Sequence, residues 1–348
     1  MITKEKIHSI LKGYDKKKIK IASICSHTSL QLFHGARQEG VKTIGICLEK
    51  YKKTYDSFPY GKPHEYIIVN SYSDIPAKEL VEENAIVIPH GSFVEYVGKK
   101  LENLAVPMFG NRMSLMWEGD RNKLFEWMKD SGLQIPRLFT PETIDRPCIV
   151  KLPGAKGGKG YTIVSSPAEF KRKVKEEKFI IQEYISGVRV YPHYFYSPIS
   201  KGGYDVNGGS LELMSIDRRL ETNIDESYRA TLAGVRVEPS FTVIGNEPVI
   251  LRESLVREIM EMGANVVKSS YRLFNGLPGP FCVEMICTED MKFYAFEISA
   301  RIVAGTNLYP LGSPYTCYSY REPMSTGRRI AREIKRAVKL NKLESVIY

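Results

Sequence analysis

The sequence predicts a mixed α/β and α+β protein built from three consecutive parts, and three observations support this. Residues 1–115 alternate helical and β-rich stretches, which is typical of a small Rossmann-like α/β layer with a parallel sheet. Residues 116–187 contain an amphipathic helix and then two β-rich runs on either side of a glycine-rich loop. Residues 188–348 contain longer β-rich runs and a helical stretch near 254–273, which indicates a larger second lobe.

Within the first part, β-rich runs at residues 19–26, 43–48 and 66–70 predict the strands. His27 follows the first of these runs, and Ser92 follows a further run at residues 85–89. Ser-His-Thr-Ser before Leu30 also looks like a helix N-cap, and this alternative stays open. Both interpretations are compatible, because free N–H groups at a helix start can bind a phosphate. Two strand ends that face one crevice predict a substrate cleft there.

The second part begins with the segment 120–136, which predicts a helix, then a glycine, then Ile-Pro at the entry into a new domain. Apolar side chains recur there at close to helical spacing, and Gly132 supplies a stop. Lys123 near its start could reach a phosphate, whereas a surface lysine on an amphipathic helix is the alternative.

A glycine- and lysine-rich loop lies between two β-rich runs in residues 149–164. Glycine lets backbone N–H groups approach phosphate oxygens, and lysine supplies compact positive charge. The order is neither that of a Walker loop nor that of a dinucleotide fingerprint. The alternative is a glycine-rich hairpin without a ligand. We expect the loop to cover a nucleotide with Lys151, Gly154, Lys156, Gly157, Gly158, Lys159 and Gly160.

The apolar run at residues 180–185 contains Glu183 and follows a charged, helix-like stretch. In a nucleotide-binding fold such a linker can offer backbone groups to adenine while its acid binds a ribose hydroxyl. Taken alone, this signal is weak.

The most specific prediction from the sequence concerns two carboxylates in the third part. Glu284 and Glu297 stand in neighbouring β-rich runs joined by the polar segment 288–292, so a hairpin would bring them together. Paired carboxylates suit Mg²⁺, which prefers oxygen ligands and often bridges to substrate phosphates. The alternative is that both are ordinary outward-facing strand residues.

Composition narrows the class of protein. The chain has 348 residues, 43% of them hydrophobic, and a net charge of +10. It has no apolar run of about twenty residues and no signal-peptide core, so we expect a cytoplasmic protein without membrane partners. The basic residues are dispersed and no nucleic-acid module is recognisable, so anionic small molecules are the expected partners. The six cysteines form no C-x-x-C pair, which predicts reduced thiols and no zinc site.

Taken in order, Lys123, Lys151 with its glycine loop, Glu183, Glu284 and Glu297 resemble the ATP-grasp superfamily, with residues 1–115 as its preceding (pre-ATP-grasp) domain. The usual superfamily ending is Glu-x-Asn, whereas this chain has Glu297-Ile298-Ser299-Ala300-Arg301. Over most of its length the chain resembles the archaeal family of formate-dependent phosphoribosylaminoimidazolecarboxamide ligases. The segments that match are residues 26–30, 89–93, 108–112, 193–198, 221–225 and 297–307, together with the glycine loop.

The resemblance implies a reaction and a set of roles. The family uses ATP and formate to convert 5-aminoimidazole-4-carboxamide ribonucleotide (AICAR) into its formyl derivative (FAICAR) in purine biosynthesis, through formyl phosphate, and it assembles as trimers or hexamers. The resemblance implies that Glu284 and Glu297 bind Mg²⁺ or Mn²⁺ and that Glu183 and Glu221 contact ATP. It places His27, Ser92 and Asn246 at AICAR, and we add Arg301 as a cation near the phosphates or the formyl group. The expected domains are 1–115 for AICAR, 116–187 for the phosphate loop and 188–348 for the metal carboxylates.

One departure leaves alternatives open. Some relatives have an acid and a glycine where this chain has Val303 and Ala304. A paralogous ligase with another carboxylate or amine substrate, or a nucleotide-binding paralogue without catalysis, therefore remains an alternative.

Overall fold

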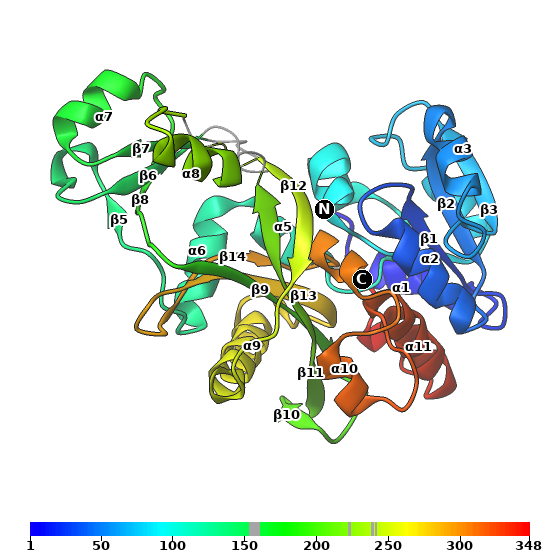
Figure 1. The fold of residues 1–348 in the computed structure, drawn as a ribbon. Coiled ribbons are helices and arrows are strands. Elements are labelled where there is room, and N and C mark those ends of the chain that lie inside the picture. The colour runs from blue at the N-terminus through cyan, green and yellow to red at the C-terminus, as the bar shows by residue number, and fades with distance from the viewer. Residues whose placement is uncertain (153–160, 222–223, 238–239, 241) are drawn as a thin grey trace.

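The computed structural model contains three sheets, and Figure 1 shows the third sheet in chain order lying between the first and the second. It describes residues 1–348 except 153–160, 222–223, 238–239 and 241. Among the described residues, no helix has the length and apolar character needed to cross a membrane.

The first sheet is parallel, with strand order β3-β2-β1-β4. The inner strands β1, β2 and β4 are mostly buried and mostly apolar, as strands of a covered parallel sheet are, whereas the edge strand β3 is partly exposed. The strands are β1 (Lys20–Ile24), β2 (Thr43–Leu48), β3 (Glu65–Val69) and β4 (Ala85–Val87), and the helices are α1 (Lys4–Lys12), α2 (Ser29–Gln38), α3 (Glu49–Asp56) and α4 (Ala77–Glu82). The predicted parallel α/β layer is confirmed.

The second sheet is small and antiparallel, with strand order β5-β8-β6-β7. Helices α5 (Arg112–Gly119) and α6 (Arg121–Asp130) lead into it. Its elements are β5 (Leu138–Phe139), β6 (Cys148–Lys151), β7 (Tyr161–Val164), α7 (Pro167–Lys173) and β8 (Ile180–Glu183). Strands β6 and β7 flank the glycine-rich loop, which lies outside the described residues.

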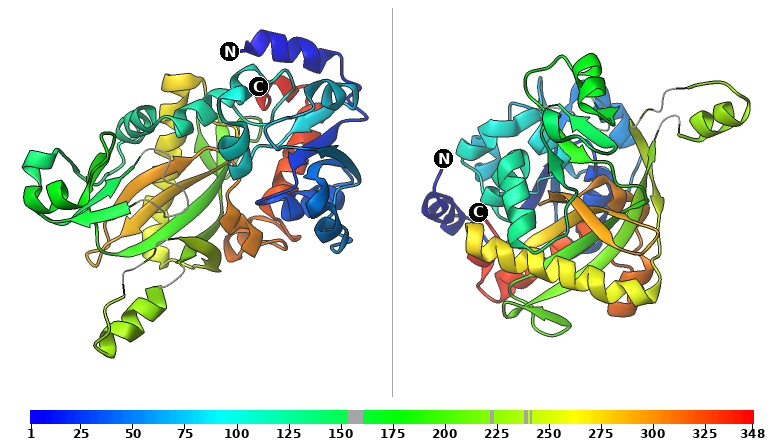
Figure 2. Two further views of the ribbon diagram at one scale, coloured as in Figure 1. Left: turned by 90° about the horizontal axis from the view of Figure 1, so that it is seen from above. Right: turned by 90° about the vertical axis from the view of Figure 1, so that its left-hand side faces the viewer.

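The third sheet is the largest, with strand order β10-β11-β9-β13-β14 and with β12 paired to β11. Figure 2 shows α9 lying along one face of this sheet. The close contact needs Gly263, because a Cβ at that position would lie 2.6 Å from the Tyr194 ring. The elements are β9 (Val188–Ser197), β10 (Tyr204–Val206), β11 (Gly209–Glu221), α8 (Ile224–Leu232), β12 (Val243–Pro248), α9 (Glu253–Phe274), β13 (Gly279–Cys287), β14 (Phe293–Ser299), α10 (Pro314–Ser319) and α11 (Thr326–Lys339).

The C-terminal helix α11 packs against α2 of the first layer, so the two ends of the chain share a core. A Cβ at Gly35 would lie 2.1 Å from the backbone nitrogen of Arg328, and a Cβ at Gly327 would lie 2.6 Å from the Gln31 carbonyl. Glycine at both positions therefore lets the two helix backbones approach closely. This packing holds the first layer against the third sheet.

Candidate active site

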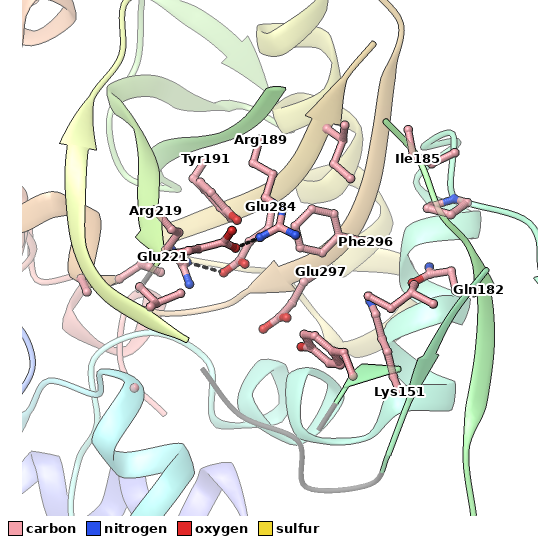
Figure 3. Close-up of a pocket in the computed structure, with 18 of the residues that line it drawn as sticks. Lys151, Gln182, Ile185, Arg189, Tyr191, Arg219, Glu221, Glu284, Phe296 and Glu297 are labelled. Atoms are coloured by element: carbon pink, nitrogen blue, oxygen red, sulfur yellow. Dashed lines mark hydrogen bonds and ion pairs between the residues drawn. The ribbon is translucent and has the colours of Figure 1, made fainter. Parts of the chain in front are cut away.

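The main cavity has a volume of about 470 Å³ and is lined by residues of the second and third sheets and by residues that follow β1 and β4 in the first layer. Figure 3 shows Glu221, Arg219 and Glu284 on one side, Lys151 and Gln182 on the facing side, and Glu297 pointing into the space between them. This volume is in the range of cavities that bind small ligands and cofactors.

Glu284 and Glu297 are directly opposite each other in the antiparallel register of β13 and β14. A register shift follows between Glu284 and Met285, and both carboxylates line the cavity. Glu284 Oε1 lies 2.8 Å from Arg219 Nη2 and accepts a hydrogen bond from Ser299 Oγ at 3.2 Å. The sequence prediction that a hairpin brings the two acids together agrees with this register.

Burial, followed by the nearby charges of Glu284 and Glu118, raises the pKa of Glu297 to about 7. Acids that repel one another in a shared cavity are the donor set that a hard divalent cation neutralises. The pair therefore fits the expected Mg²⁺ or Mn²⁺. Among the described residues, no group of three or more His, Cys, Asp or Glu side chains forms a metal cluster, so other ligands would come from substrate or water.

Two arginines stand beside the acids, and each has one ionic partner. Arg219 is paired with Glu284 and lies over the Tyr191 ring at 4.3 Å. Arg301 Nη2 lies 2.9 Å from Glu118 Oε1, and Glu118 also accepts a hydrogen bond from the Ala300 backbone at 2.8 Å. The Nε atoms of both arginines are buried and have no hydrogen-bond partner among the residues that the structure describes. Each guanidinium can thus donate to an anion in the cavity while its carboxylate partner holds it in place.

Lys151 ends β6 and lines the same cavity, 5.4 Å from the centre of the Phe296 ring. Burial lowers its pKa to about 8, against the opposing effect of Glu297. Lys151 is therefore mostly charged at neutral pH and is placed to meet an anionic ligand. The other loop residues predicted to bind phosphate, Gly154, Lys156, Gly157, Gly158, Lys159 and Gly160, lie outside the described residues.

Glu183 and Glu221 also line the cavity, on different sheets. Glu183 Oε1 lies 3.3 Å from Arg146 Nη1, and its Oε2 accepts a hydrogen bond from the Arg137 backbone at 3.3 Å. Glu221 forms an ion pair with Arg189. The structure brings both predicted nucleotide contacts to the cavity that contains Lys151.

His27 lies on the wall formed by the first layer. Its ring stacks on His90 with 5.2 Å between centroids, and its backbone adopts a left-handed conformation with φ 57°. A Cβ on Gly91 would lie 2.7 Å from His27 Nε2, so glycine there leaves room for the ring. Loss of solvent around the ring, followed by electrostatic repulsion from His90 and Arg301, lowers the pKa of His27 well below its ordinary value. The ring is therefore neutral at pH 7.

Three predicted contacts lie outside the cavity lining. Ser92 is buried, and its hydroxyl donates to Ser26 Oγ at 3.0 Å. Asn246 donates to Asp217 at 2.7 Å, although Val243 of the same strand lines the cavity. Lys123 is exposed, with its ammonium 5.9 Å from the centre of the Trp117 ring, so the surface-lysine alternative describes it and we assign it no role.

Sequence reasoning missed Glu118, Arg219 and Asp217. The two β11 residues could have been found by counting back from Glu221 in steps of two, because alternate strand residues share a face. Glu118 gave no such signal, since a glutamate on a helix usually faces solvent.

The fold was compared with solved structures. The chain matches the crystal structure of an IMP biosynthesis protein PurP from Thermococcus kodakaraensis with a TM-score of 0.74 and 29% identity, covering 94% of this chain and 100% of that one. It also matches N5-carboxyaminoimidazole synthetase from Staphylococcus aureus, complexed with ADP, with a TM-score of 0.62 and 16% identity over 92% and 79% of the two chains. The second match shows the fold alone. Fold and cavity together define an ATP-grasp protein, as predicted.

Curated relatives identify the family. A 5-formaminoimidazole-4-carboxamide-1-(beta)-D-ribofuranosyl 5'-monophosphate synthetase from Korarchaeum cryptofilum is 52% identical, and one from Methanococcoides burtonii is 50% identical, each over 100% of both chains. Two family profiles also match, a domain of unknown function (DUF1297) at residues 169–348 and a protein of unknown function (DUF1246) at residues 21–139. The chain belongs to this family of synthetases, which confirms the resemblance inferred from its motifs.

Proposed function

We propose that this protein is an ATP-dependent carbon–nitrogen ligase that joins formate to the 5-amino group of AICAR and forms FAICAR, ADP and phosphate, in purine (IMP) biosynthesis. The observation that carries the proposal is the acid pair Glu284 and Glu297, which shares one cavity with Lys151, three arginines and His27. The names of the full-length relatives support the same product.

The reaction needs formate to become a good acyl donor. A formate oxygen attacks the γ-phosphorus of ATP, the bond to the bridging oxygen breaks, and ADP leaves. The amine nitrogen of AICAR then attacks the formyl carbon, phosphate leaves, and the nitrogen loses a proton. Both steps develop negative charge on oxygen, so catalysis depends mainly on positioning and charge neutralisation.

Roles follow from where the side chains lie. Glu284 and Glu297 would hold Mg²⁺ or Mn²⁺, which when bound neutralises the charge of the phosphates. Lys151 would bind the triphosphate together with the glycine loop, and Glu183 and Glu221 would contact ATP. Arg301, held by Glu118, would donate its free Nε–H to formate or to the phosphoryl group.

AICAR would bind on the opposite wall, near His27. Because the pKa of His27 is lowered, the neutral ring can donate from one nitrogen and accept at the other. Ser92 and Asn246 are proposed as further AICAR contacts. We also propose the domain division 1–115, 116–187 and 188–348. We propose, from the resemblance, that the protein is a homotrimer or homohexamer, which light scattering can test. We also propose that it is located in the cytoplasm and has no nucleic-acid or membrane partners.

The test is ADP release by the purified protein with MgATP and AICAR, with and without formate, while FAICAR is followed by chromatography. Formate-dependent ADP that matches FAICAR in amount supports the ligase and makes Val303 and Ala304 a tolerated variation. ATP binding without turnover would contradict the proposal and favour a paralogue with another substrate, or one without catalysis.

A further inference from the structure

A buried acid, Asp217, connects three strands beside the cavity. It is on β11 and has an exposed fraction of 0%. Its Oδ1 lies 2.5 Å from His193 Nε2 on β9, and its Oδ2 accepts a hydrogen bond from Asn246 Nδ2 on β12 at 2.7 Å. A buried carboxylate is tolerated only when it is well paired, and here both oxygens have a donor.

The backbone leaves room for this carboxylate at one point in particular. A Cβ on Gly305 would lie 2.1 Å from Asp217 Oδ1 and 2.6 Å from its Oδ2. Gly305 follows directly on Val303 and Ala304, which line the cavity. Asp217 is thus enclosed between the sheet and the segment that closes the active site.

The chemistry of the three groups fixes the orientation of the Asn246 amide. An ionised carboxylate can only accept hydrogen bonds, so the group that faces Asp217 must be the NH₂ of Asn246. Oxygen and nitrogen of an amide are otherwise assigned from their partners, and here one assignment alone is consistent. His193 donates to the other oxygen, which holds the carboxylate in register with Asn246.

The amide oxygen of Asn246 is therefore turned away from Asp217. In the part of the chain that the structure describes, no hydrogen bond reaches Asn246 Oδ1. Asn246 is opposite Arg219 in the β11–β12 register, so the two side chains share a face of the sheet, and Arg219 lines the cavity. The result is a half-buried acceptor with fixed polarity beside the active site.

We propose that His193 and Asp217 are positioning residues that present Asn246 Oδ1 as an acceptor to an N–H group of the aminoimidazole substrate. The inference rests on the proposed function, because AICAR carries its amine and its carboxamide NH₂ on adjacent ring carbons. Neither His193 nor Asp217 touches the substrate. A site that presents an acceptor selects for N–H groups and against ligands that bring only acceptors, such as a carboxylate.

Two single variants and their combination test the polarity. Asp217→Asn places two amides side by side, so either amide can donate to the other. Asn246→Asp places two carboxylates side by side, and when both are ionised neither can donate to the other. Each should weaken AICAR binding, measured by calorimetry, by about tenfold or more, because a well-placed hydrogen bond is lost and polar groups are left unpaired.

The combined variant Asp217→Asn/Asn246→Asp should recover most of the binding, to within about threefold of wild type. In this variant the amide at position 217 accepts from His193 and donates to the carboxylate at position 246. The second carboxylate oxygen at 246 then replaces the original amide oxygen as the acceptor. Recovery relative to both single variants is the expected result.

Asp130→Asn is the control for removing an acid that accepts from two side chains, because Asp130 accepts from Ser269 at 2.5 Å and Arg272 at 2.7 Å and does not line the cavity. It should bind AICAR as wild type does. MgATP affinity and melting temperature report on folding and should change little in Asp217→Asn.

Three outcomes would overturn the inference. Asp217→Asn could bind AICAR as tightly as wild type, the combined variant could be no better than the single ones, or AICAR and MgATP binding could fall together with the melting temperature, which would indicate a purely structural role. Wild-type protein that binds no AICAR would instead overturn the proposed function, and the inference with it.

Discussion

Lys151 makes affinity for ATP depend on pH in a direction that the structure predicts. Burial in the cavity lowers the pKa of its ammonium to about 8. A group with this pKa is about 90% charged at pH 7, half charged at pH 8 and about 10% charged at pH 9. The charge is therefore lost as pH rises through 8, so a phosphate ligand that needs this charge should bind more weakly at higher pH.

The magnitude follows from linkage. If a bound triphosphate restores the pKa of Lys151 to its ordinary value near 10.5, recharging the ammonium at pH 9 costs about 1.4 kcal/mol, and the Kd for MgATP should rise about tenfold between pH 7 and pH 9. Calorimetric titration at pH 7, 8 and 9 measures this. Lys151→Arg keeps its charge over this range and should bind with nearly constant affinity. Lys151→Met should bind weakly at every pH.

Comparing the Kd of wild type with that of Lys151→Arg separates the effect of Lys151 from the effects of other groups that titrate between pH 7 and pH 9. Glu297, with a pKa near 7, gains charge over the lower part of this range, but it does so in both proteins. A wild-type Kd that does not change between pH 7 and pH 9, or one that rises equally in Lys151→Arg, would refute the assignment of Lys151 to the phosphates.

Three further predictions concern the acids and the close packing. Glu297→Gln should reduce formate-dependent ADP release by about 10³-fold, because it removes a ligand of the ion that neutralises the phosphates. Its melting temperature at pH 8 should exceed that of wild type. The pKa of Glu297 is raised to about 7 in the folded protein, so the free energy of unfolding falls as pH rises from the pKa of the unfolded chain toward 7. Gln at this position does not titrate, so the variant does not lose this stability. Turnover near the wild-type rate would contradict the metal role. Glu118→Gln should raise the KM for formate about tenfold while MgATP affinity stays nearly constant, because Arg301 loses its ionic partner; an unchanged KM in initial-rate assays would count against Arg301 as the formate contact. Gly305→Ala should destabilise the protein by about 2–4 kcal/mol in denaturant unfolding, since its Cβ would lie 2.1 Å from Asp217 Oδ1, whereas Gly119→Ala, with open space around it, should be nearly neutral.

Much of the fold could be predicted from local patterns. The parallel layer was predictable because β-rich, mostly apolar runs alternate there with helical stretches. The helix expected near 254–273 corresponds to α9 within one residue at each end, since it has long, regular apolar spacing. The limits of the three domains stay a prediction.

The site was predictable where two acids lie on a hairpin, because the pairing of adjacent strands is a local event. It was not predictable where the partner comes from a distant element. Glu118 becomes a cavity residue only because α5 packs beside β14 and Ala300 donates to it. Ser92 and Asn246 were expected at the substrate from the resemblance, yet each bonds to another residue of the chain, Ser26 and Asp217. For Asn246, that bond uses the amide NH₂ and turns the amide oxygen away from Asp217.

The central claim is that formate is activated by the γ-phosphate of ATP within this cavity. The most direct measurement is a reaction of the purified protein with MgATP, AICAR and formate labelled with ¹⁸O at both oxygens, followed by mass spectrometry of the released phosphate. Attack of formate on the γ-phosphorus places one formate oxygen in the phosphate, so we predict one ¹⁸O per phosphate and one in the formyl group of FAICAR. Unlabelled phosphate formed at the same rate as FAICAR would contradict the account, because ATP would then be cleaved by water and not by formate.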